Sequence, residues 1–474
     1  MGVLFRHGVA SGEPAMTSVS LWTRVSSSEA EVQLRWVVEP DGTGDHDRGE
    51  GAHSGMAVAS FLDDHTVTVV AGDLRPGTWY RYWFEGPDGA RSPTARTRTL
   101  PAGGGPMRIG FTCCARYGLG YFTAYRMLAE EGCDLIVHLG DYVYEDADSW
   151  VPDRLPDPPY EAHTLGDYRR RYAQHRCDTD LQALHHAAPM VPVWDDHDVA
   201  EGAPRETGVA ARQRRRDGQQ AWREWLPISS HGEAGNTVDR MIPVAGLVDL
   251  VVFDARFSGR HPHDRSGPRP EPHERRQILA DTQWDLLETV LRSSTAPWRI
   301  LANQVQVGPM RLGYLPSIRR MGLRPVVNPD QWDGYAHERR RLYDLLAGAG
   351  PSLLVSGDLH STWFRTLRHE GRRLAQELTV TSVSGETYAE AFRLRTHASP
   401  RLLERLIRSF NEGIRFLDLY RHGYAIVDIS AERLDATAVL LDTVAGRHSG
   451  VERVGLARLV RRVAPGEGSG TVRS

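Results

Sequence analysis

The chain of 474 residues has a formal net charge of −4, and its hydrophobic and charged fractions are 40% and 25%. This composition excludes disordered and fibrous classes and predicts a globular protein with more than one domain. The small net charge gives no signal for specific nucleic-acid binding or for broad attraction to a membrane surface. All 57 basic residues are arginine, which excludes enzymes that depend on a P-loop lysine or a lysine Schiff base.

Cysteine usage and hydropathy leave the location of the protein open. The four cysteines, Cys113, Cys114, Cys133 and Cys177, are too few in so long a chain to form a disulfide framework. No apolar run approaches the roughly 20 residues of a transmembrane helix, and Met1–His7 lacks the apolar region of a signal peptide. From the sequence as written we expect a cytoplasmic protein, or an exported one whose targeting segment is not included. The oligomeric state stays unknown.

Residues 1–102 have the pattern of a small all-β sandwich. Short alternating runs, separated by Gly, Asp and Pro turns, predict strands at 18–25, 31–38, 66–71 and 79–85. The last of these begins in a way that suits a fibronectin-III-like domain. No group of catalytic residue types occurs here, so we expect this domain to pack against the rest of the chain.

From residue 103 to 474 the pattern is that of an α/β catalytic domain. A strand at 107–112, a helix at 121–131 and a strand at 135–139 form a βαβ unit, which places both strand ends at one edge of a parallel sheet. Further strands are predicted at 190–194, 247–254, 298–302, 353–356, 424–429 and 435–441. Helices are predicted at 165–186, 282–292, 335–346 and 400–410, a long loop at 261–274, and no element in the polar, arginine-rich stretch 201–225.

Candidate ligands follow five of these strands, where α/β proteins bind their ligands. They are Cys114, Asp141 with Tyr144, Asp196 with His197, Asn303, and Asp358 with His360. Each motif alone is weak evidence for a ligand, because a Gly-Asp pair often forms a turn and adjacent cysteines usually pack in a core. Alternation places only one of Cys113 and Cys114 on the side of the site.

The run Trp194–Asp198 is more specific than the other motifs. Its three carboxylates surround one imidazole and repel one another unless a cation or arginines neutralise them. Thiolate, phenolate and imidazole groups suit a trivalent or borderline transition metal, whereas carboxylates and an amide carbonyl suit a harder divalent ion. Asp141 could bridge two such ions, and a pair of cations about 3.5–4 Å apart is the clamp used for in-line phosphoryl transfer.

The same motifs carry a resemblance to a known family. They are Phe5–Pro14, Leu21–Arg24, Phe111–Cys114, His138–Glu145, Trp194–Asp198, Leu301–Val305 and Ser356–His360. In these residues the chain resembles the PhoD-like alkaline phosphatases, a branch of the calcineurin-like and purple-acid-phosphatase-like metallophosphoesterases. The resemblance runs from residue 5 to about residue 440. It implies an α/β metallophosphoesterase fold, with two mixed β-sheets packed together and flanked by helices, preceded by the fibronectin-III-like sandwich.

The resemblance also implies a role for each candidate residue. Cys114, Tyr144 and His360 match ligands of a ferric ion (Fe³⁺), and Asp141 matches a bridging ligand. Asp196, Asn303 and Asp358 match ligands of a second metal, for which calcium (Ca²⁺) is implied and Mn²⁺, Zn²⁺ or Mg²⁺ are alternatives. His197 matches a histidine that contacts the phosphate and protonates the leaving oxygen. Arg169, in the group 169–171, is a further candidate for contacting phosphate.

Two departures from the family pattern affect these expectations. Relatives usually have Glu where this chain has Asp198, so we expect looser support of His197. The twin-arginine export signal expected for many relatives is absent from this sequence.

Our mechanistic hypothesis is direct hydrolysis of a phosphate mono- or diester by a metal-activated hydroxide, since the sequence contains no Gly-x-Ser-x-Gly nucleophile motif. The expected substrate is a phosphate-ester small molecule or a phospholipid. A phospholipase D-type phosphodiesterase is an alternative that uses the same metals. A remote alternative is a metal-stabilised binding or adhesion protein in which the β-sandwich is the working part.

Overall fold

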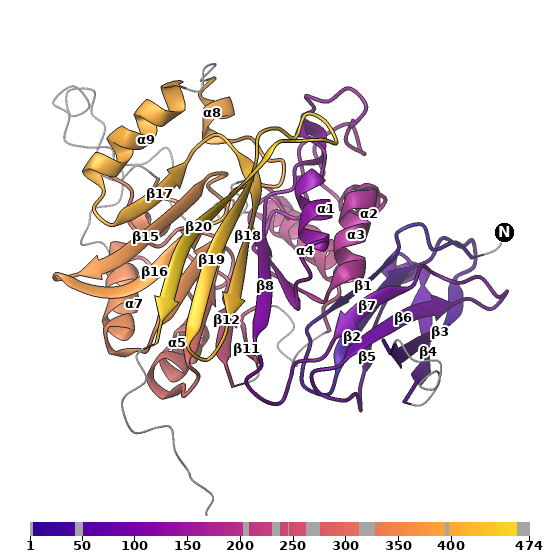
Figure 1. Cartoon of the computed structure of the whole chain (residues 1–474). Coiled ribbons are helices and arrows are strands. Elements are labelled where there is room, and N and C mark those ends of the chain that lie inside the picture. Colours follow the sequence, from indigo (N-terminus) through magenta and orange to yellow (C-terminus); the bar gives the residue numbers. More distant parts are fainter. Residues whose placement is uncertain are drawn as a thin grey trace, which may run out of the picture.

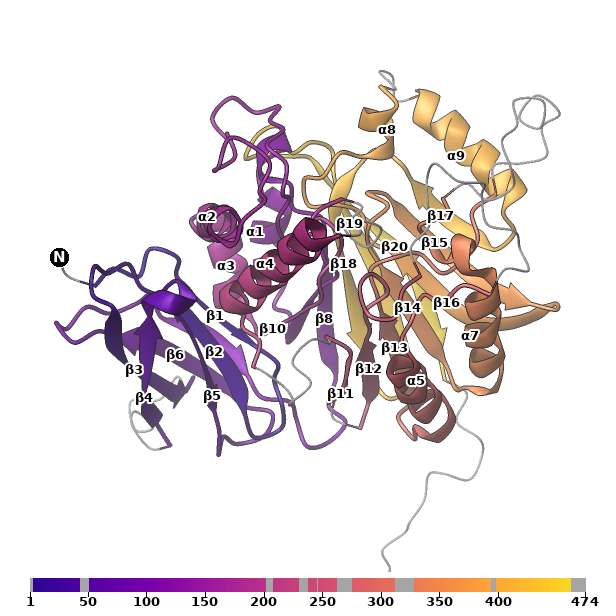
Figure 2. The ribbon, with the colours of Figure 1, turned by 180° about the vertical axis from the view of Figure 1, so that it is seen from behind.

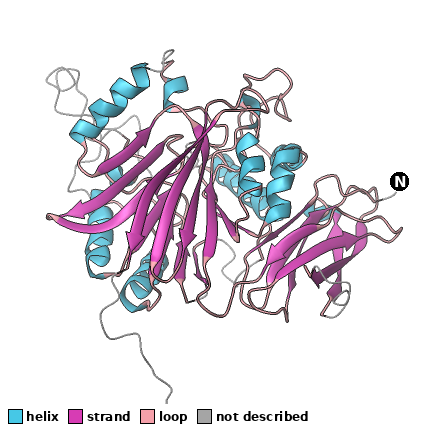
Figure 3. Ribbon diagram, viewed as in Figure 1, coloured by secondary structure: helices cyan, strands magenta, loops and turns pink. Residues whose placement is uncertain are grey.

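The strands form three sheets in the part of the chain that the structure, a computed structural model, describes (Figures 1 and 3). That part comprises residues 3–42, 51–201, 208–229, 238–244, 246–261, 275–311, 328–393 and 398–461. The long loop predicted at 261–274 lies outside these residues except for His261. Two of the sheets build the larger α/β region, and the third belongs to the N-terminal region.

The nine-stranded sheet contains the strands that the βαβ pattern predicts. At its centre β8, β9 and β10 are parallel, with Ile109 opposite Leu135 and Val191 opposite Val137. Leu135–His138 is buried on both faces, which explains its continuous apolar run. In spatial order the strands are β20 (Val451–Val460), β19 (Arg433–Leu441), β18 (His422–Ile429), β8 (Met107–Thr112), β9 (Leu135–His138), β10 (Met190–Pro192), β1 (Val9–Gly12), β2 (Val19–Arg24) and β5 (Thr66–Ala71).

The seven-stranded sheet packs one face against the nine-stranded sheet and the other against helices. Ile300 shares a core with Phe111 of β8. Its neighbour Leu301 packs with Trp284 of α5 (Asp281–Ser293) and Leu342 of α7 (Ala336–Gly348). This is the two-residue alternation of a strand covered on both sides. In spatial order the strands are β11 (Arg240–Val244), β12 (Val248–Val252), β13 (Trp298–Ala302), β14 (Ser352–Ser356), β16 (Arg372–Thr379), β15 (Thr362–His369) and β17 (Ile414–Asp418).

The N-terminal region is a β-sandwich that is continuous with the larger region. A four-stranded sheet, β4-β3-β6-β7, covers β1, β2 and β5 with a shared apolar core. Strand β1 then pairs in parallel with β10, where Gly12 is opposite Met190 (Figure 2). The four strands are β3 (Glu31–Pro40), β4 (His53–Ser60), β6 (Trp79–Glu85) and β7 (Ala95–Arg98).

Helices cover the outer face of the seven-stranded sheet and part of the nine-stranded sheet (Figures 1 and 2), whereas no described helix lies over β19 and β20. Those on the nine-stranded sheet are α1 (Thr123–Ala129), α2 (Leu165–Arg176), α3 (Thr179–Ala187) and α4 (Val209–Trp225). Those on the seven-stranded sheet are α5 (Asp281–Ser293) and α7 (Ala336–Gly348), preceded by the 3₁₀ turn η3 (Trp332–Tyr335). The short α8 (Tyr388–Ala391) and α9 (Ala398–Phe410) precede β17, and the 3₁₀ turns η1 (Phe61–Asp63) and η2 (Tyr117–Leu119) lie in loops. None of the described helices is both long and apolar enough to span a bilayer.

Two predicted helical features differ in the structure. The predicted helix at 165–186 is two helices, because the Asp178 carboxylate accepts hydrogen bonds from the backbone N–H groups of Asp180 and Leu181 at 2.9 and 3.2 Å and starts α3 there. The arginine-rich stretch without a predicted element contains α4, which buries only Gly218, Ala221, Trp222 and Trp225. Their helical spacing is the signal that the surrounding arginines obscure.

Replacement of Gly12 by alanine should weaken the junction between β1 and β10. An added Cβ would lie 2.6 Å from the Met190 carbonyl oxygen and would also contact Pro227. We expect Gly12→Ala to lower the free energy of unfolding by about 1–3 kcal/mol in urea titrations. Gly72→Ala is the control, because its Cβ would meet no heavy atom of the described residues within 4 Å. Equal stability of the two variants would contradict a tight junction.

Candidate metal centre

The candidate ligands come from loops at one edge of the two sheets. Cys114 follows β8, Asp141 and Tyr144 follow β9, and Asp196 and His197 follow β10, while Asn303 and Asp358 with His360 follow β13 and β14. Since β8, β9 and β10 are parallel, as are β13 and β14, their carboxyl ends share an edge. The two sheets meet closely there, and a Cβ on Gly357 would lie 2.8 Å from Cys113 Sγ.

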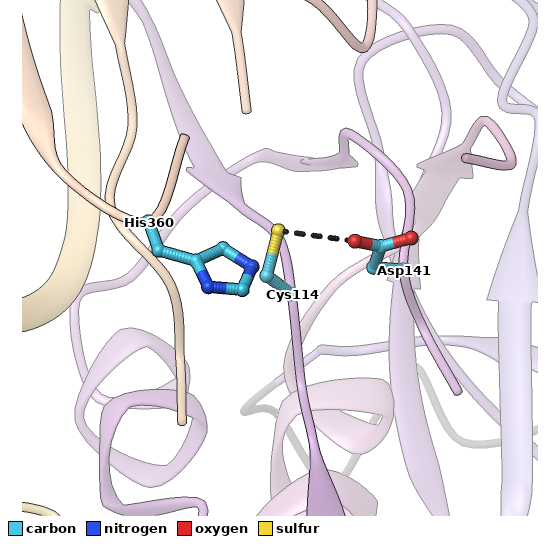
Figure 4. Close-up of side chains that lie close together, drawn as sticks. All are labelled: Cys114, Asp141 and His360. Carbon is cyan, nitrogen blue, oxygen red and sulfur yellow. Dashed lines mark hydrogen bonds between the residues drawn. The ribbon is translucent and has the colours of Figure 1, made fainter. Parts of the chain in front are cut away.

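The first group brings together a thiol, a carboxylate and an imidazole (Figure 4), and the phenol of Tyr144 joins them. Cys114 Sγ lies 3.6 Å from Asp141 Oδ2, and ligand atoms of Cys114, Asp141 and His360 all lie within 4.8 Å of one another. The Tyr144 hydroxyl lies 3.0 Å from Asp141 Oδ2 and 2.9 Å from His360 Nε2. Cys113 faces away, with its Sγ 3.5 Å from the carbonyls of Val380 and Thr381.

The hydrogen bonds in this group prepare His360 as a ligand. His360 Nδ1 lies 2.8 Å from the Glu386 carbonyl oxygen, so it is the protonated nitrogen and Nε2 carries the lone pair. Burial lowers the pKa of His360 to about 4, which keeps the imidazole neutral. The single hydroxyl proton of Tyr144 lies between two acceptors, His360 Nε2 and Asp141 Oδ2. A cation at this point would satisfy the lone pairs of all four groups.

The second group is built mainly from carboxylates. Ligand atoms of Asp141, Asp196 and His197, and those of Asp195, Asp196 and Asp358, lie within 4.8 Å of one another. The backbone N–H of His197 donates to Asp141 Oδ1 at 3.2 Å. The two oxygens of Asp141 therefore face the two groups.

Asn303 is linked to the second group through the neighbouring residues Gln331 and Trp332. Its Oδ1 accepts hydrogen bonds from the backbone N–H of Val305 at 3.2 Å and from Trp332 Nε1 at 3.4 Å. The residue before Trp332, Gln331, donates through its side-chain amide to Asp358. Asn303 Nδ2 is buried and makes no hydrogen bond with a described residue.

A buried arginine that the sequence analysis did not assign lies among the carboxylates. Arg256 is 1% exposed, and its guanidinium contacts Asp195 and Asp358 directly, with Asp330 at 3.3 Å and Asp196 at 3.5 Å. It follows β12 just after Asp254, so it occupies a further strand end. The predicted strand 247–254 marks this position, but a single arginine after it belongs to no motif.

Support for His197 comes from Glu145 and not from the residue that follows the motif. His197 Nδ1 lies 2.8 Å from Glu145 Oε2. Asp198 instead accepts backbone N–H groups from both loops: those of Asp141 and Asp195 at 2.8 and 2.9 Å, and those of Tyr142 and Val143 at 3.0 and 3.2 Å. The expectation that Asp198 loosens the support of His197 is therefore wrong, because Asp198 anchors the loops and Glu145 holds the ring.

The backbone at four candidate ligands is strained. Cys114, Asp141, Asp358 and His360 have φ values of 59°, 53°, 64° and 45°. These lie in the left-handed region, which costs non-glycine residues free energy and is maintained only where the surroundings impose it. Such strain concentrates at functional sites, and here it affects the residues that turn their side chains toward the cluster.

Burial makes the charges of this cluster unfavourable without a cation. It raises the pKa values of Asp141, Asp358 and the Cys114 thiol, and neighbouring acidic groups raise them further. Burial opposes ionisation of Asp196 as well, but the Arg256 guanidinium holds its pKa below the usual value. Arg256 contacts several carboxylates, and Arg260 pairs with one of them, Asp330. The carboxylates outnumber these two guanidinium groups, so the cluster is suited to bind a cation.

Burial also opposes a charge on His197, but Glu145, Asp141 and Asp196 raise its pKa well above the usual value. The imidazole is therefore held in its protonated form.

The structure does not bring Arg169 to this cluster. Its guanidinium forms two hydrogen bonds of 2.7 Å with the Glu224 carboxylate of α4 and a third with the Leu62 carbonyl. Arg116 is closer, with its guanidinium 5.4 Å from the centre of the Tyr144 ring and its Nη2 2.8 Å from Asp146. Neither arginine donates a hydrogen bond to a candidate ligand among the described residues.

Comparison with known proteins identifies the family. The profile of the PhoD-like phosphatase matches residues 109–438, and that of the PhoD-like phosphatase N-terminal domain matches residues 2–101. The chain belongs to the PhoD-like phosphatase family. Alkaline phosphatase D of Bacillus subtilis (strain 168) is 31% identical over 405 residues, which cover 79% of this chain and 67% of that protein.

A solved structure of PhoD agrees with this assignment. It superposes with a TM-score of 0.81 at 27% identity, covering 98% of this chain and 93% of that one. The α/β fold with an N-terminal β domain is therefore confirmed, and the chain is a phosphoric ester hydrolase. The remote alternative of a binding or adhesion protein finds no support in these comparisons.

Removal of the Arg256 guanidinium should destabilise the protein when metals are chelated, because it leaves buried carboxylates uncompensated. We expect Arg256→Met to lower the free energy of unfolding in EDTA by about 3–5 kcal/mol, and added divalent cation to recover part of the loss. Urea titrations with and without metal measure both effects. Arg292→Met is the control, since that side chain is 68% exposed and, among the described residues, its ion pair is with Glu288. An unchanged stability of Arg256→Met would contradict this account.

Proposed function

We propose that the cluster is a binuclear or larger metal centre at which this chain hydrolyses phosphate esters. The observation that supports it is the position of Asp141: Oδ2 faces Cys114 and Tyr144, while Oδ1 faces the His197 backbone beside Asp196. A buried carboxylate with ligand groups on both sides is suited to bridge two cations. Asp195 Oδ2 is buried and accepts no hydrogen bond from a described residue, which indicates that protein contacts alone do not satisfy the cluster.

The donor atoms suggest which metals fit. Cys114, Tyr144 and His360 supply sulfur, phenol oxygen and imidazole nitrogen, which suit ferric iron, and Asp141 completes that group. Asp196, Asn303 and Asp358 supply only oxygen, which suits calcium, with Mn²⁺, Zn²⁺ or Mg²⁺ as alternatives. When bound, such ions supply Lewis acidity toward a phosphoryl oxygen and lower the pKa of a water molecule.

His197 is suited to move a proton during the reaction. The bond of Nδ1 to Glu145 fixes the orientation of the ring and stabilises its cationic form. Nε2 makes no hydrogen bond with another described residue, so a proton on it is available to the oxygen of a departing alcohol. Glu145 acts through His197 and is a positioning residue.

We also propose that the chain divides after residue 102 into a fibronectin-III-like sandwich and a metallophosphoesterase domain. Two features support this division. The four-stranded sheet packs on β1, β2 and β5 to form the sandwich, and the two larger mixed sheets pack together. The substrate is a phosphate mono- or diester of a small molecule. Parallel assays with p-nitrophenyl phosphate, bis-p-nitrophenyl phosphate and phosphatidylcholine separate a monoesterase from a diesterase and from the phospholipase D-type alternative.

Loss of the bridging carboxylate should remove both metal and activity. We expect Asp141→Asn to lose bound metal, measured by elemental analysis, and to lower kcat for p-nitrophenyl phosphate by more than about a hundredfold. The control is Asp428→Asn, which removes a half-exposed carboxylate paired with Arg108 on the same sheet. Full metal content and activity in Asp141→Asn would exclude the bridging role.

Direct hydrolysis should invert the configuration at phosphorus. A covalent enzyme intermediate would require two displacements and would give net retention. We therefore expect a single inversion when a chiral phosphorothioate ester is hydrolysed in ¹⁸O-labelled water and the product is analysed by ³¹P NMR. Net retention would show that a side chain of the protein is the nucleophile.

A further inference from the structure

A second feature that can bind an anion lies outside the candidate metal centre. An open cavity of about 520 Å³ is lined by residues of α7, β15, the segment before residue 312 and the turn from α9 to β17. Five arginines line it: Arg311, Arg339, Arg340, Arg365 and Arg368. None of the candidate metal ligands lines this cavity, so it is not part of that site.

The arginines outnumber the carboxylates available to neutralise them. Arg339 pairs with Asp333, and Arg365 lies near Glu377. Glu412 is a further lining carboxylate. Arg311, Arg340 and Arg368 have no ion pair with a carboxylate among the described residues, and all three are exposed. The cavity therefore has a positive field that favours an anion.

Arg365 provides a buried donor whose capacity is not used by the protein. The residue is 3% exposed, and one nitrogen, Nη1, donates to the Pro309 carbonyl at 2.7 Å. Nε lies 3.4 Å from Glu377 Oε2 but forms no hydrogen bond, and Nη2 also lacks one. Glu377 is engaged elsewhere, since it accepts the backbone N–H groups of Val307 and Gly308 at 2.7 and 3.0 Å. Buried donors without partners are costly.

We propose that this cavity binds a phosphate-type oxyanion, either free or as the phosphate group of a small organic molecule. Guanidinium groups bind phosphate through paired N–H donors and remain charged when buried. The cavity is larger than an inorganic phosphate ion, and its volume falls in the range of small-molecule binding sites. Tyr343 and Phe410, which also line the cavity, provide surface for an organic part.

Phosphate binding tests the proposal on the full-length, metal-loaded protein. We expect equilibrium dialysis with radiolabelled inorganic phosphate to give two sites in the wild type. The rim variant Arg340→Gln/Arg368→Gln should weaken one of them at least about tenfold. The matched control is Arg292→Gln/Arg458→Gln, which removes two exposed arginines on α5 and β20 and should retain both sites. Arg365→Met is a further variant, and the rim variant keeps the test valid if Arg365→Met does not fold.

The Asp141→Asn variant separates this site from the metal centre. If both proposals hold, it loses one phosphate site and retains the one that the rim variant weakens. Competition with phenylphosphonate in this variant distinguishes the two sources: tighter binding than inorganic phosphate indicates an organic phosphate, and weaker binding indicates the free ion. Absence of phosphate binding to Asp141→Asn, or unchanged binding by the rim variant, would overturn the cavity proposal. Retention of both sites and of turnover in Asp141→Asn would instead refute the metal centre.

Discussion

The concentration of buried negative charge at one sheet edge is the constraint on which the rest of the site depends. Asp141, Asp195 and Asp196 are at most 5% exposed, and Arg256 is the guanidinium among them. Carboxylates removed from water repel one another and favour protonation unless cations compensate them. The strained backbone conformations and the neutral imidazole of His360 fit a fold that maintains this arrangement in order to hold metal ions.

Two kinds of anchoring keep the loops in place around this charge. Asp198 joins the loops after β9 and β10 through four backbone hydrogen bonds, and burial raises its pKa to about 7. Glu145 and the Glu386 carbonyl orient His197 and His360. Both anchors are contacts within the protein, so they position the candidate ligands without using the ligand atoms themselves. Such preorganisation limits the reorganisation that the reaction requires.

The sequence predicts the parts of this structure that follow from local pattern. Continuous apolar runs identified β8, β9, β13 and β14, and the polar residues after them are those that the structure brings together. Partnerships between distant segments were not predictable in this way. Arg169 is a phosphate candidate in the sequence, yet its partner Glu224 lies 55 residues later. Arg256 was missed because an isolated arginine has no motif, and β15 and β16 were missed because they bury Arg365 and Glu377.

The pairing of β1 with β10 has a consequence for how the N-terminal region can be handled. A module attached by a linker can be removed or exchanged. Here β1 of the N-terminal region and β10 of the larger region are neighbouring strands of one sheet. A fragment that begins after residue 102 would lose β1, whose Gly12 is paired with Met190, and would leave β10 at the edge of the sheet. Uncovered edge strands promote self-association. Expression of the phosphatase region alone would therefore favour aggregates over an active enzyme.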